Sequence, residues 1–367
     1  MKIDFANLQH QYQLYKDEID EAINKVLNNS NYIMGAEVGE FELSLQKFTK
    51  SKHAISCSNG TDALVLALMA LDIKPGDEVI TPPFTFISSA ETISFIGATP
   101  VFVDIDEKTY NINHHKIEEA ITQKTKAIIP VNLYGQPADI DPIIKIANKY
   151  NLKVILDGAQ CFGSTYKNKS AATYGDMYTT SFFPAKPLGC YGDGGAVFTD
   201  SDDLAKKIKS LRVHGQDKRY HHDFIGMTGR LDTLQAAVLN VKLRKYSNEI
   251  IMRNNVASMY SKYLSDIEKV VTPSVISDRK SVWAQYTIRV KNREKLGKKL
   301  QEYGIPTAIH YPIPLHMQNC FKYLNIPYGA YPVSEKISQE VISLPMNPFV
   351  SEEEIKYIAD KIRNILN

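Results

Sequence analysis

Short apolar runs alternate with amphipathic stretches over the first half of the chain and slightly beyond. The runs are rich in β-branched residues and are short enough to be buried strands, whereas the stretches between them have helical patterns. Strands separated by helices predict a mostly parallel sheet that is covered on both faces. The predicted strands lie at 53–56, 78–81, 100–104, 126–131, 153–157, 178–183 and 195–199, and the first predicted helix lies at 61–71.

After the predicted sheet, the hydrophobic pattern of the sequence changes, and this change divides the chain into two predicted domains. We predict a large α/β domain over residues 1–245 and a smaller C-terminal α+β domain over residues 246–367. The boundary is inferred from the change of pattern alone, because the chain has no internal repeat or low-complexity tract. The elements predicted after the sheet are a charged helical region at 205–262, a strand at 283–290, a helix at 293–303, a strand near 306–309 and a helix from Ser351.

Composition excludes several classes of function. The 367 residues are 44% hydrophobic and 23% charged, with a formal net charge of +2, which is ordinary for a globular protein and leaves no tail to bind a polyanion. We therefore expect no nucleic-acid partner. The start of the chain lacks the apolar core of a signal peptide, and no uncharged apolar stretch reaches the ~18 residues of a membrane span. We expect a cytoplasmic protein without membrane contact.

Motifs for metals and nucleotides are missing from the sequence. The four cysteines are scattered, without a Cys-x-x-Cys pair or histidines at zinc spacing, so we expect reduced thiols and no metal site. Gly192-Asp193-Gly194 is not a dinucleotide fingerprint, because Val197 stands where its third glycine would be. Neither a Walker phosphate loop nor a His-Glu-x-x-His motif occurs. Nucleotide hydrolysis and zinc proteolysis therefore have no support.

A candidate phosphate site lies between a predicted strand and a predicted helix, at residues 58–64 (Ser-Asn-Gly-Thr-Asp-Ala-Leu). The free backbone N–H groups and the dipole at such a helix start attract anions. Gly60 allows the backbone a close approach, and Thr61 can serve both as the N-cap and as a hydroxyl donor. Taken alone, the segment is better explained as a simple helix cap.

Asp157 and Lys186 are the most informative pair in the chain. Asp157 ends an apolar strand, where ligands collect in open α/β sheets, and Lys186 follows Ser181-Phe-Phe and precedes four glycines. An acid and a lysine are the groups that pyridoxal phosphate (PLP) needs at its two ends: the acid keeps the pyridine nitrogen protonated, and the lysine forms a Schiff base and shuttles a proton. Gln160 would reach the 3-oxygen of the ring. The alternatives are a turn or cap aspartate, a surface lysine and a loop amide.

Six motifs in this order resemble the DegT/DnrJ/EryC1/StrS family of nucleotide-sugar aminotransferases, over nearly the whole chain. The resemblance implies the aspartate-aminotransferase type of fold (fold type I), a homodimer with active sites at the subunit interface, and PLP as the cofactor. The motifs are residues 58–64, 82–86 (Pro-Pro-Phe-Thr-Phe), 157–160 (Asp-Gly-Ala-Gln), 181–186 (Ser-Phe-Phe-Pro-Ala-Lys) with 192–195, 230–237 (Arg-Leu-Asp-Thr-Leu-Gln-Ala-Ala) and 310–316 (His-Tyr-Pro-Ile-Pro-Leu-His).

The resemblance also assigns roles to residues. Relatives usually carry Asn two residues before the arginine of the Arg-Leu-Asp motif, where it reaches the cofactor phosphate of the partner subunit. This chain has Thr228 there, whose hydroxyl can still donate but is shorter. Phe86 can alternatively be plain core packing. By carry-over, Lys186 is the Schiff-base lysine, Asp157 pairs with the pyridinium, Gln160 contacts the 3-oxygen, Phe86 stacks on the ring, and Gly60, Thr61 and Ser181 hold the phosphate.

Within the family, the chain most resembles the branch that aminates C3 of UDP-linked 2-acetamido sugars. The implied reaction moves the amino group of L-glutamate to a UDP-3-keto sugar, in its glucose or glucuronic acid form, to make 2,3-diamino sugars for surface polysaccharide or lipid A. Arg230, His310 and Tyr311 are candidates to bind that substrate, although Arg230 can instead be an interface ion pair and Tyr311 can pack beside Pro312.

Three alternatives remain open at this point. Amination at C4 of a UDP- or dTDP-4-keto-6-deoxy sugar is the main one, because the position on the ring depends on how a few side chains orient the sugar. A PLP-dependent dehydratase of this family would carry histidine in place of Lys186. A non-catalytic regulator would be expected to carry a fused DNA-binding region or to lack the lysine.

Overall fold

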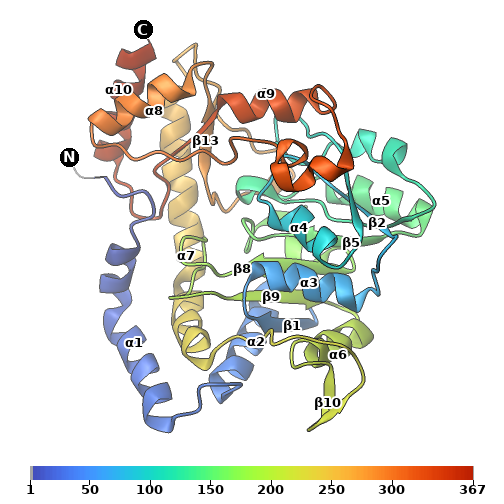
Figure 1. Ribbon diagram of the computed structural model, residues 1–367. Helices are drawn as coiled ribbons and strands as arrows, with labels where there is room; N and C mark the ends of the chain where they lie inside the picture. Colours follow the sequence, from blue (N-terminus) through green and yellow to red (C-terminus); the bar gives the residue numbers. More distant parts are fainter. Residues whose placement is uncertain (1–2, 367) are drawn as a thin grey trace.

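A seven-stranded mixed sheet forms the centre of the computed structural model, which describes residues 3–366 (Figure 1). Its strands are β1 (His53–Cys57), β2 (Glu78–Thr81), β3 (Thr99–Phe102), β4 (Thr125–Ile128), β5 (Lys153–Asp157), β8 (Met177–Ser181) and β9 (Gly195–Thr199). They lie in the order β1-β9-β8-β5-β4-β2-β3. Neighbouring strands from β8 to β3 are parallel, and β9 is antiparallel to both β8 and β1. The predicted mostly parallel sheet is confirmed.

Helices cover both faces of this sheet because its strands are apolar on both sides. One face packs against α2, α5 and the first half of α7, and the other face packs against α3, α4 and α6. The bounds of these helices are α2 (Ala36–Thr49), α3 (Gly60–Ala70), α4 (Ser88–Phe95), α5 (Ile140–Tyr150), α6 (Asp202–Leu211) and α7 (Thr233–Leu264). The α/β fold class is therefore the one that the alternation of strands and helices predicted.

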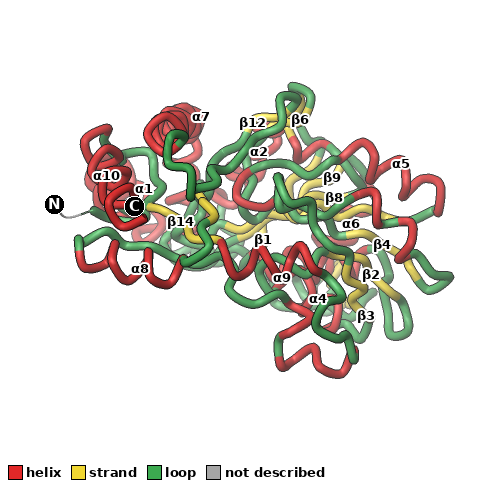
Figure 2. The backbone as a smooth tube through the Cα atoms, turned by 90° about the horizontal axis from the view of Figure 1, so that it is seen from above, coloured by secondary structure: helices red, strands yellow, loops and turns green. Residues whose placement is uncertain are grey.

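A second, smaller core lies in the C-terminal part of the chain, where α8 and α10 pack with a two-stranded sheet and the second half of α7 (Figure 2). Ile3 from the start of the chain also joins this core. Figure 1 places both ends of the chain on this side. The elements of this core are β13 (Tyr286–Arg289), α8 (Arg293–Glu302), β14 (Val341–Leu344) and α10 (Glu352–Leu366), whereas α9 (Pro332–Glu340) packs through Ile337 into a separate cluster with Phe84 and Val131.

Three sequence predictions need correction. The segment near 306–309 is not a strand but a single bridge between Ala308 and Ser343, because Pro306 has no N–H for a ladder. The helical region 205–262 is interrupted between α6 and α7 by a small hairpin, β10 (Gln216–Lys218) and β11 (His221–His222). Strand β14 was not predicted, although it is the partner of β13.

Helix α7 runs without interruption through the predicted boundary between residues 245 and 246 (Figure 1). Helix α1 (Leu8–Asn29) lies along it, and the side chains of Gln11 and Tyr15 both donate hydrogen bonds to the Glu249 carboxylate, at 2.8 and 2.9 Å. Since one helix takes part in both cores, the division into two domains stays a prediction.

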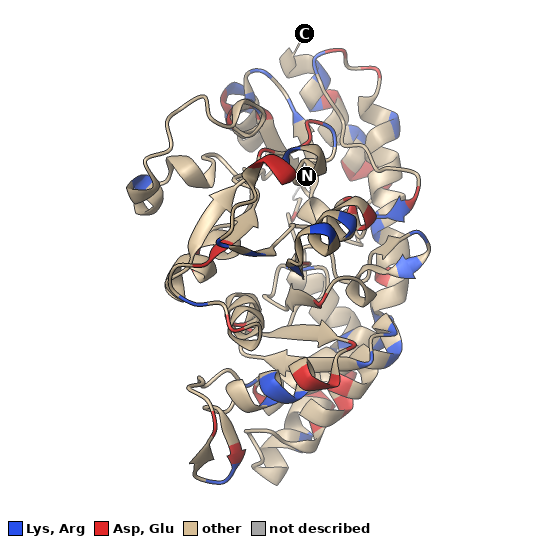
Figure 3. Ribbon diagram, turned by 90° about the vertical axis from the view of Figure 1, so that its right-hand side faces the viewer, with Lys and Arg blue, Asp and Glu red and all other residues tan. Residues whose placement is uncertain are grey.

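Acidic and basic residues are interspersed on the outer helices (Figure 3). Within residues 3–366, no helix has the length and apolar character needed to cross a membrane. The four cysteines are free, and three of them are buried.

The remaining elements are short. A three-stranded sheet comprises β6 (Thr165–Tyr166), β7 (Lys169–Ser170) and β12 (Arg279–Lys280), and the 3₁₀ turns are η1 (His114–Lys116), η2 (Glu118–Ala120), η3 (Leu133–Gly135), η4 (Ala171–Thr173), η5 (Leu315–Met317) and η6 (Asn319–Leu324).

Candidate active site

A cavity of about 630 Å³ opens beyond the carboxyl ends of the parallel strands, against segments of the C-terminal region. This is where ligands bind in open α/β sheets, and the volume suits a cofactor together with a substrate. The structure brings most of the predicted site residues to its wall. They are Gly60, Thr61, Phe86, Asp157, Gln160, Ser181, Lys186, His310 and Tyr311.

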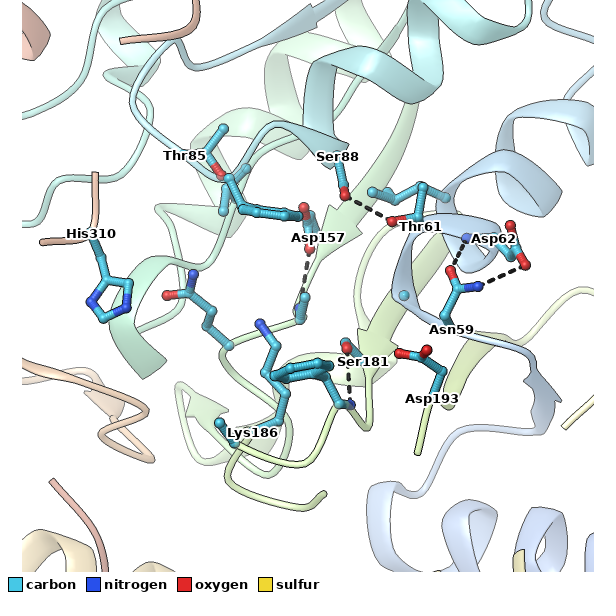
Figure 4. A pocket seen from close by; sticks show the side chains of 18 of the residues that line it. Asn59, Thr61, Asp62, Thr85, Ser88, Asp157, Ser181, Lys186, Asp193 and His310 are labelled. Atoms are coloured by element: carbon cyan, nitrogen blue, oxygen red, sulfur yellow. Dashed lines mark hydrogen bonds between the residues drawn. The ribbon is translucent and has the colours of Figure 1, made fainter. Parts of the chain in front are cut away.

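Asp157 ends β5 and turns its carboxylate toward the cavity (Figure 4). The Ser89 hydroxyl donates to Oδ2 at 2.8 Å, and the Ala159 N–H donates to Oδ1 at 3.1 Å. The side chain is only 5% exposed, and this burial raises the pKa of Asp157, whereas the two hydrogen bonds and the charge of Lys186 oppose the rise. The carboxylate is thus oriented firmly but stands in a poorly solvated place.

Lys186 reaches the same cavity from the loop that follows β8. The loop turns back sharply after the strand, and the Lys186 N–H donates to the Phe183 carbonyl at 2.8 Å. Burial lowers the pKa of Lys186, and the negative charge of Asp157 works in the opposite direction. A larger fraction of the amine is therefore neutral near pH 7 than in an exposed lysine, which makes it a better nucleophile and proton acceptor.

Asp157 and Lys186 have no salt-bridge partner among the described residues, and this tests whether PLP fits. Within residues 3–366, neither Asp157 nor Lys186 has a salt-bridge partner within 4.0 Å. An unpaired buried charge is costly, so the cavity suits a ligand that offers a cation to Asp157 and a carbonyl to Lys186. PLP has both, and when bound it supplies a protonated ring that withdraws electrons from the reacting carbon. Asp157 would hold the proton at the ring nitrogen, and Lys186 would carry protons to and from the reacting carbon.

The segment predicted to hold the phosphate, at the start of α3, lies close to the end of β8. A Cβ added at Gly60 would meet the Ser181 Cβ at 2.6 Å, so only glycine allows this approach. The Asp62 N–H donates to the Asn59 side chain and the Ala63 N–H to the Asn59 carbonyl, so among the described residues the N–H groups of Gly60 and Thr61 are the ones left for an anion. The N-cap is not Thr61, as predicted, but Asn59, whose side chain accepts from the Asp62 N–H at 2.8 Å. Thr61 instead pairs with the Ser88 hydroxyl, at 2.8 Å (Figure 4).

Gln160 and Phe86 line the middle of the cavity. Gln160 is buried, and its amide bridges two groups, accepting from the Tyr134 N–H and donating to the Tyr311 hydroxyl, both at 2.9 Å. It is therefore not a solvent-facing loop amide. Phe86 is 52% exposed and does not belong to the core, with its ring centroid 6.0 Å from that of Tyr311. An aromatic face open to the cavity can take up a flat ring.

His310 lies on the side of the cavity away from the start of α3 (Figure 4). Its Nδ1 is 2.9 Å from the Ser343 Oγ on β14, which leaves Nε2 for a ligand. Burial, together with the charge of Lys186, lowers the pKa of His310 to about 4. The imidazole is therefore neutral at physiological pH and can donate or accept one hydrogen bond there. Burial also raises the pKa of Tyr311, which keeps its hydroxyl protonated.

Thr228 and Arg230 are not among the residues that line the cavity. The Thr228 Oγ1 lies 2.7 Å from the His214 Nε2, and the side chain is exposed. The Arg230 Nε is buried and has no hydrogen-bond partner among the described residues. Their predicted roles stay predictions, and the role of Thr228 concerns a partner subunit.

The sequence predictions missed several residues in and around the cavity. Thr85, Ser88, Asp193 and Gln285 contribute to the wall, and Ser89 orients Asp157 from outside it. Asp193 lies within the glycine-rich motif, and Ser89 lies three positions after the 82–86 motif, so closeness to a motif was an available signal. Gln285 lies outside the six motifs, so no signal in the sequence pointed to it.

The fold and the site together define a PLP-dependent aminotransferase. Residues 13–363 match the DegT/DnrJ/EryC1/StrS aminotransferase family, and the chain belongs to this family. It is 49% identical, over 99% of its length and 100% of the relative's, to the UDP-2-acetamido-2-deoxy-3-oxo-D-glucuronate aminotransferase of Pseudomonas aeruginosa.

Two further similarities concern the substrate and the cofactor. The chain is 40% identical to the UDP-N-acetyl-3-dehydro-alpha-D-glucosamine 3-aminotransferase of Acidithiobacillus ferrooxidans, over 100% of this chain and 98% of the relative. It superimposes with a TM-score of 0.92 on the structure of NtdA from Bacillus subtilis with the bound cofactor PMP, at 31% identity, covering 100% of this chain and 85% of that one. The family and this structure agree with the cofactor that the cavity fits.

Proposed function

We propose that this enzyme transfers the amino group of L-glutamate to the C3 keto carbon of UDP-2-acetamido-2-deoxy-3-oxo-D-glucuronate. The observation that carries the proposal is the 49% identity to the glucuronate aminotransferase over essentially the full length of both chains. The identity to the enzyme that acts on the glucosamine form is lower, at 40%. The uronate is therefore favoured over the glucose form of the sugar.

The cavity is consistent with two half-reactions in one site. In the first, Lys186 would move the proton from the α-carbon of glutamate, water would release 2-oxoglutarate, and the amino group would remain on the cofactor. In the second, the keto oxygen of the sugar would leave as water, C3 would receive the amino group, and Lys186 would deliver the proton to C3. Asp157 remains charged throughout, so the same pair of residues works in both directions. Ping-pong kinetics follow, because the first product leaves before the sugar binds.

The test is the visible absorbance of the purified protein. We expect a band near about 400 nm from the bound cofactor, which L-glutamate removes and the 3-oxo-glucuronate substrate restores. Restoration by the 3-oxo-glucose form alone would correct the sugar, and restoration by a 4-keto-6-deoxy sugar alone would replace C3 amination by C4 amination. A band that glutamate leaves unchanged would refute glutamate as the donor.

The cellular location, the oligomeric state and the use of the product are part of the same proposal. The enzyme would work in the cytoplasm as a homodimer with shared active sites, without nucleic acid or membrane partners, and its 2,3-diamino sugar would serve surface polysaccharide or lipid A. Thr228 would then contact the cofactor phosphate across the interface. Sedimentation of the purified protein tests the dimer, and a monomeric active enzyme would refute the shared site.

A further inference from the structure

Gln285 lines the cavity and has no assigned role, and one polar atom of its side chain has no hydrogen-bond partner among the described residues. It lines the cavity together with Lys186 and His310. Its Oε1 is buried and has no hydrogen-bond partner within the described part of the chain. A buried acceptor without a donor is destabilising, so such an atom in a binding cavity indicates a group that arrives with the ligand.

The local structure explains why this side chain faces the cavity. Gln285 directly precedes β13, and side chains alternate between the two sides of an extended chain. Tyr286 is fully buried in the C-terminal core, where its ring stacks on that of Tyr260 at 4.8 Å. Gln285 is consequently directed to the opposite side, toward the large sheet. His310 lies in another segment of the same region. Its Nδ1 is close to the Ser343 Oγ on β14, the strand that pairs with β13.

Glutamate and the keto sugar differ in the hydrogen-bond donors that they can offer to the Gln285 Oε1. Both carboxylates of glutamate are acceptors, and its amine is used at the reacting carbon, so glutamate has no donor left for Oε1. A 2-acetamido-3-keto sugar has donors on both sides of its keto carbon, the acetamido N–H at C2 and the hydroxyl at C4. An acceptor in the wall therefore matches the sugar and not the amino acid.

We propose that Gln285 is a specificity-determining residue for the sugar half-reaction. It accepts a hydrogen bond from the acetamido N–H or the hydroxyl next to the keto carbon, and it thereby presents C3 to Lys186. This inference rests on the proposed 3-keto sugar substrate. It adds a residue that acts in one half-reaction only, whereas Lys186 and Asp157 act in both.

A structural role is the competing explanation. Gln285 also borders a second cavity, of about 20 Å³, between Tyr134 and Trp283, and this space is large enough for one water molecule. A water there could satisfy Oε1 without any substrate. In that case replacement of Gln285 would disturb both half-reactions equally, or neither.

The experiment measures the two half-reactions separately in Gln285→Met, which keeps the length of the side chain but has no strong acceptor. We expect the rate and the KM of the glutamate half-reaction to stay within about twofold of the wild type. We expect kcat/KM for the 3-oxo-glucuronate substrate to fall by about 10- to 100-fold, as for the loss of one buried hydrogen bond. Gln301→Met, on the exposed side of α8, is the matched control and should leave the glutamate and the sugar half-reactions unchanged.

A second variant tests the direction of the hydrogen bond. Gln285→Glu keeps an acceptor, so it should retain more sugar activity than Gln285→Met, and it keeps the experiment decisive if the Met variant does not fold. Equal loss in both half-reactions, or an unchanged sugar half-reaction, would overturn the assignment of Gln285. Failure of the wild-type enzyme to aminate any 3-keto sugar would instead refute the proposed function, so the two failures are distinguishable.

Discussion

The two walls of the cavity are built in different ways. The wall that we propose for the cofactor (the cofactor wall), with Asp157, Ser181 and Lys186, lies on the ends of β5 and β8 and in the loop that follows β8. The wall that we propose for the substrate (the substrate wall), with Gln285 and His310, comes from segments next to the two-stranded sheet of the C-terminal region. Strand ends in a sheet that is buried on both faces hold their side chains rigidly, and irregular segments can vary without loss of the fold.

This difference suggests a division of labour. Charges on the cofactor wall should affect every step, because the same cofactor takes part in both half-reactions. Neutral donors and acceptors on the substrate wall should affect only the substrate that they contact. The following predictions test this division, from the largest expected effect to the smallest.

Replacement of Lys186 by alanine should abolish both half-reactions and the absorbance band near about 400 nm, because no other amine described in the cavity can bond the cofactor or move its proton. Turnover and absorbance measure this directly. Lys153→Ala is a suitable control, since this exposed lysine pairs with Asp176 at 2.9 Å at the opposite end of β5. Amino transfer that persisted in Lys186→Ala would break the assignment of the cofactor wall.

Replacement of Asp157 by asparagine should slow both half-reactions by about 100-fold or more, because the shape is kept while the charge that holds the proton at the ring nitrogen is lost. Single-turnover rates with glutamate and with the keto sugar measure the two effects. Asp176→Asn provides the control, because Asp176 accepts from the Val154 N–H at 2.9 Å, far from the cavity end of the strand. An effect on the sugar half-reaction alone would contradict the shared role of Asp157.

Replacement of Gly60 by alanine should weaken cofactor binding by about tenfold, which corresponds to about 1.4 kcal/mol. The new Cβ would lie 2.6 Å from the Ser181 Cβ, so the two segments that hold the phosphate must move apart. Titration of the apoenzyme with PLP measures the Kd. Gly39→Ala on α2 has nothing within 4 Å of its new Cβ and should bind PLP normally. Normal binding by Gly60→Ala would show that this close approach does not form the phosphate site.

Replacement of His310 by glutamine should have the smallest effect on turnover, a loss of less than about tenfold, because His310 is already neutral and glutamine is a neutral hydrogen-bonding group. The wild-type rate for the sugar should therefore show no inflection from this histidine between pH 5 and 8. An inflection near pH 6.5 that disappears in His310→Gln would show that His310 titrates in the working range.

The same residue makes a prediction for stability. The folded-state pKa of about 4 lies below the ordinary value of about 6.5, so the unfolded chain binds more protons in this window. The stability that His310 contributes is complete above pH 6.5 and is lost as the pH falls toward 4. Between pH 7.5 and 4.5 the Tm of the wild type should consequently fall more than that of His310→Gln. An equal fall in both proteins would contradict the buried, neutral histidine.

Local patterns explain why the cofactor wall could be predicted. Asp157 and Lys186 each belong to a short motif next to an apolar strand, and a strand end in a parallel sheet has a known place relative to the ligand. The predicted strand 153–157 agrees with β5 residue for residue. The N-cap of α3 was wrong by two residues, because Asn59 and Thr61 are both good capping residues and only the backbone geometry chooses between them.

The sequence alone determined the α/β class and predicted nine of the residues that line the cavity, because periodicity and turn chemistry act over a few neighbouring residues. Only the tertiary structure decided that Ser89 orients Asp157, that Gln160 bridges Tyr134 and Tyr311, and that the Gln285 Oε1 lies buried without a partner. These facts join segments that are distant along the chain. They depend on how the C-terminal region packs against the large sheet, and packing of this kind leaves no local pattern in the sequence.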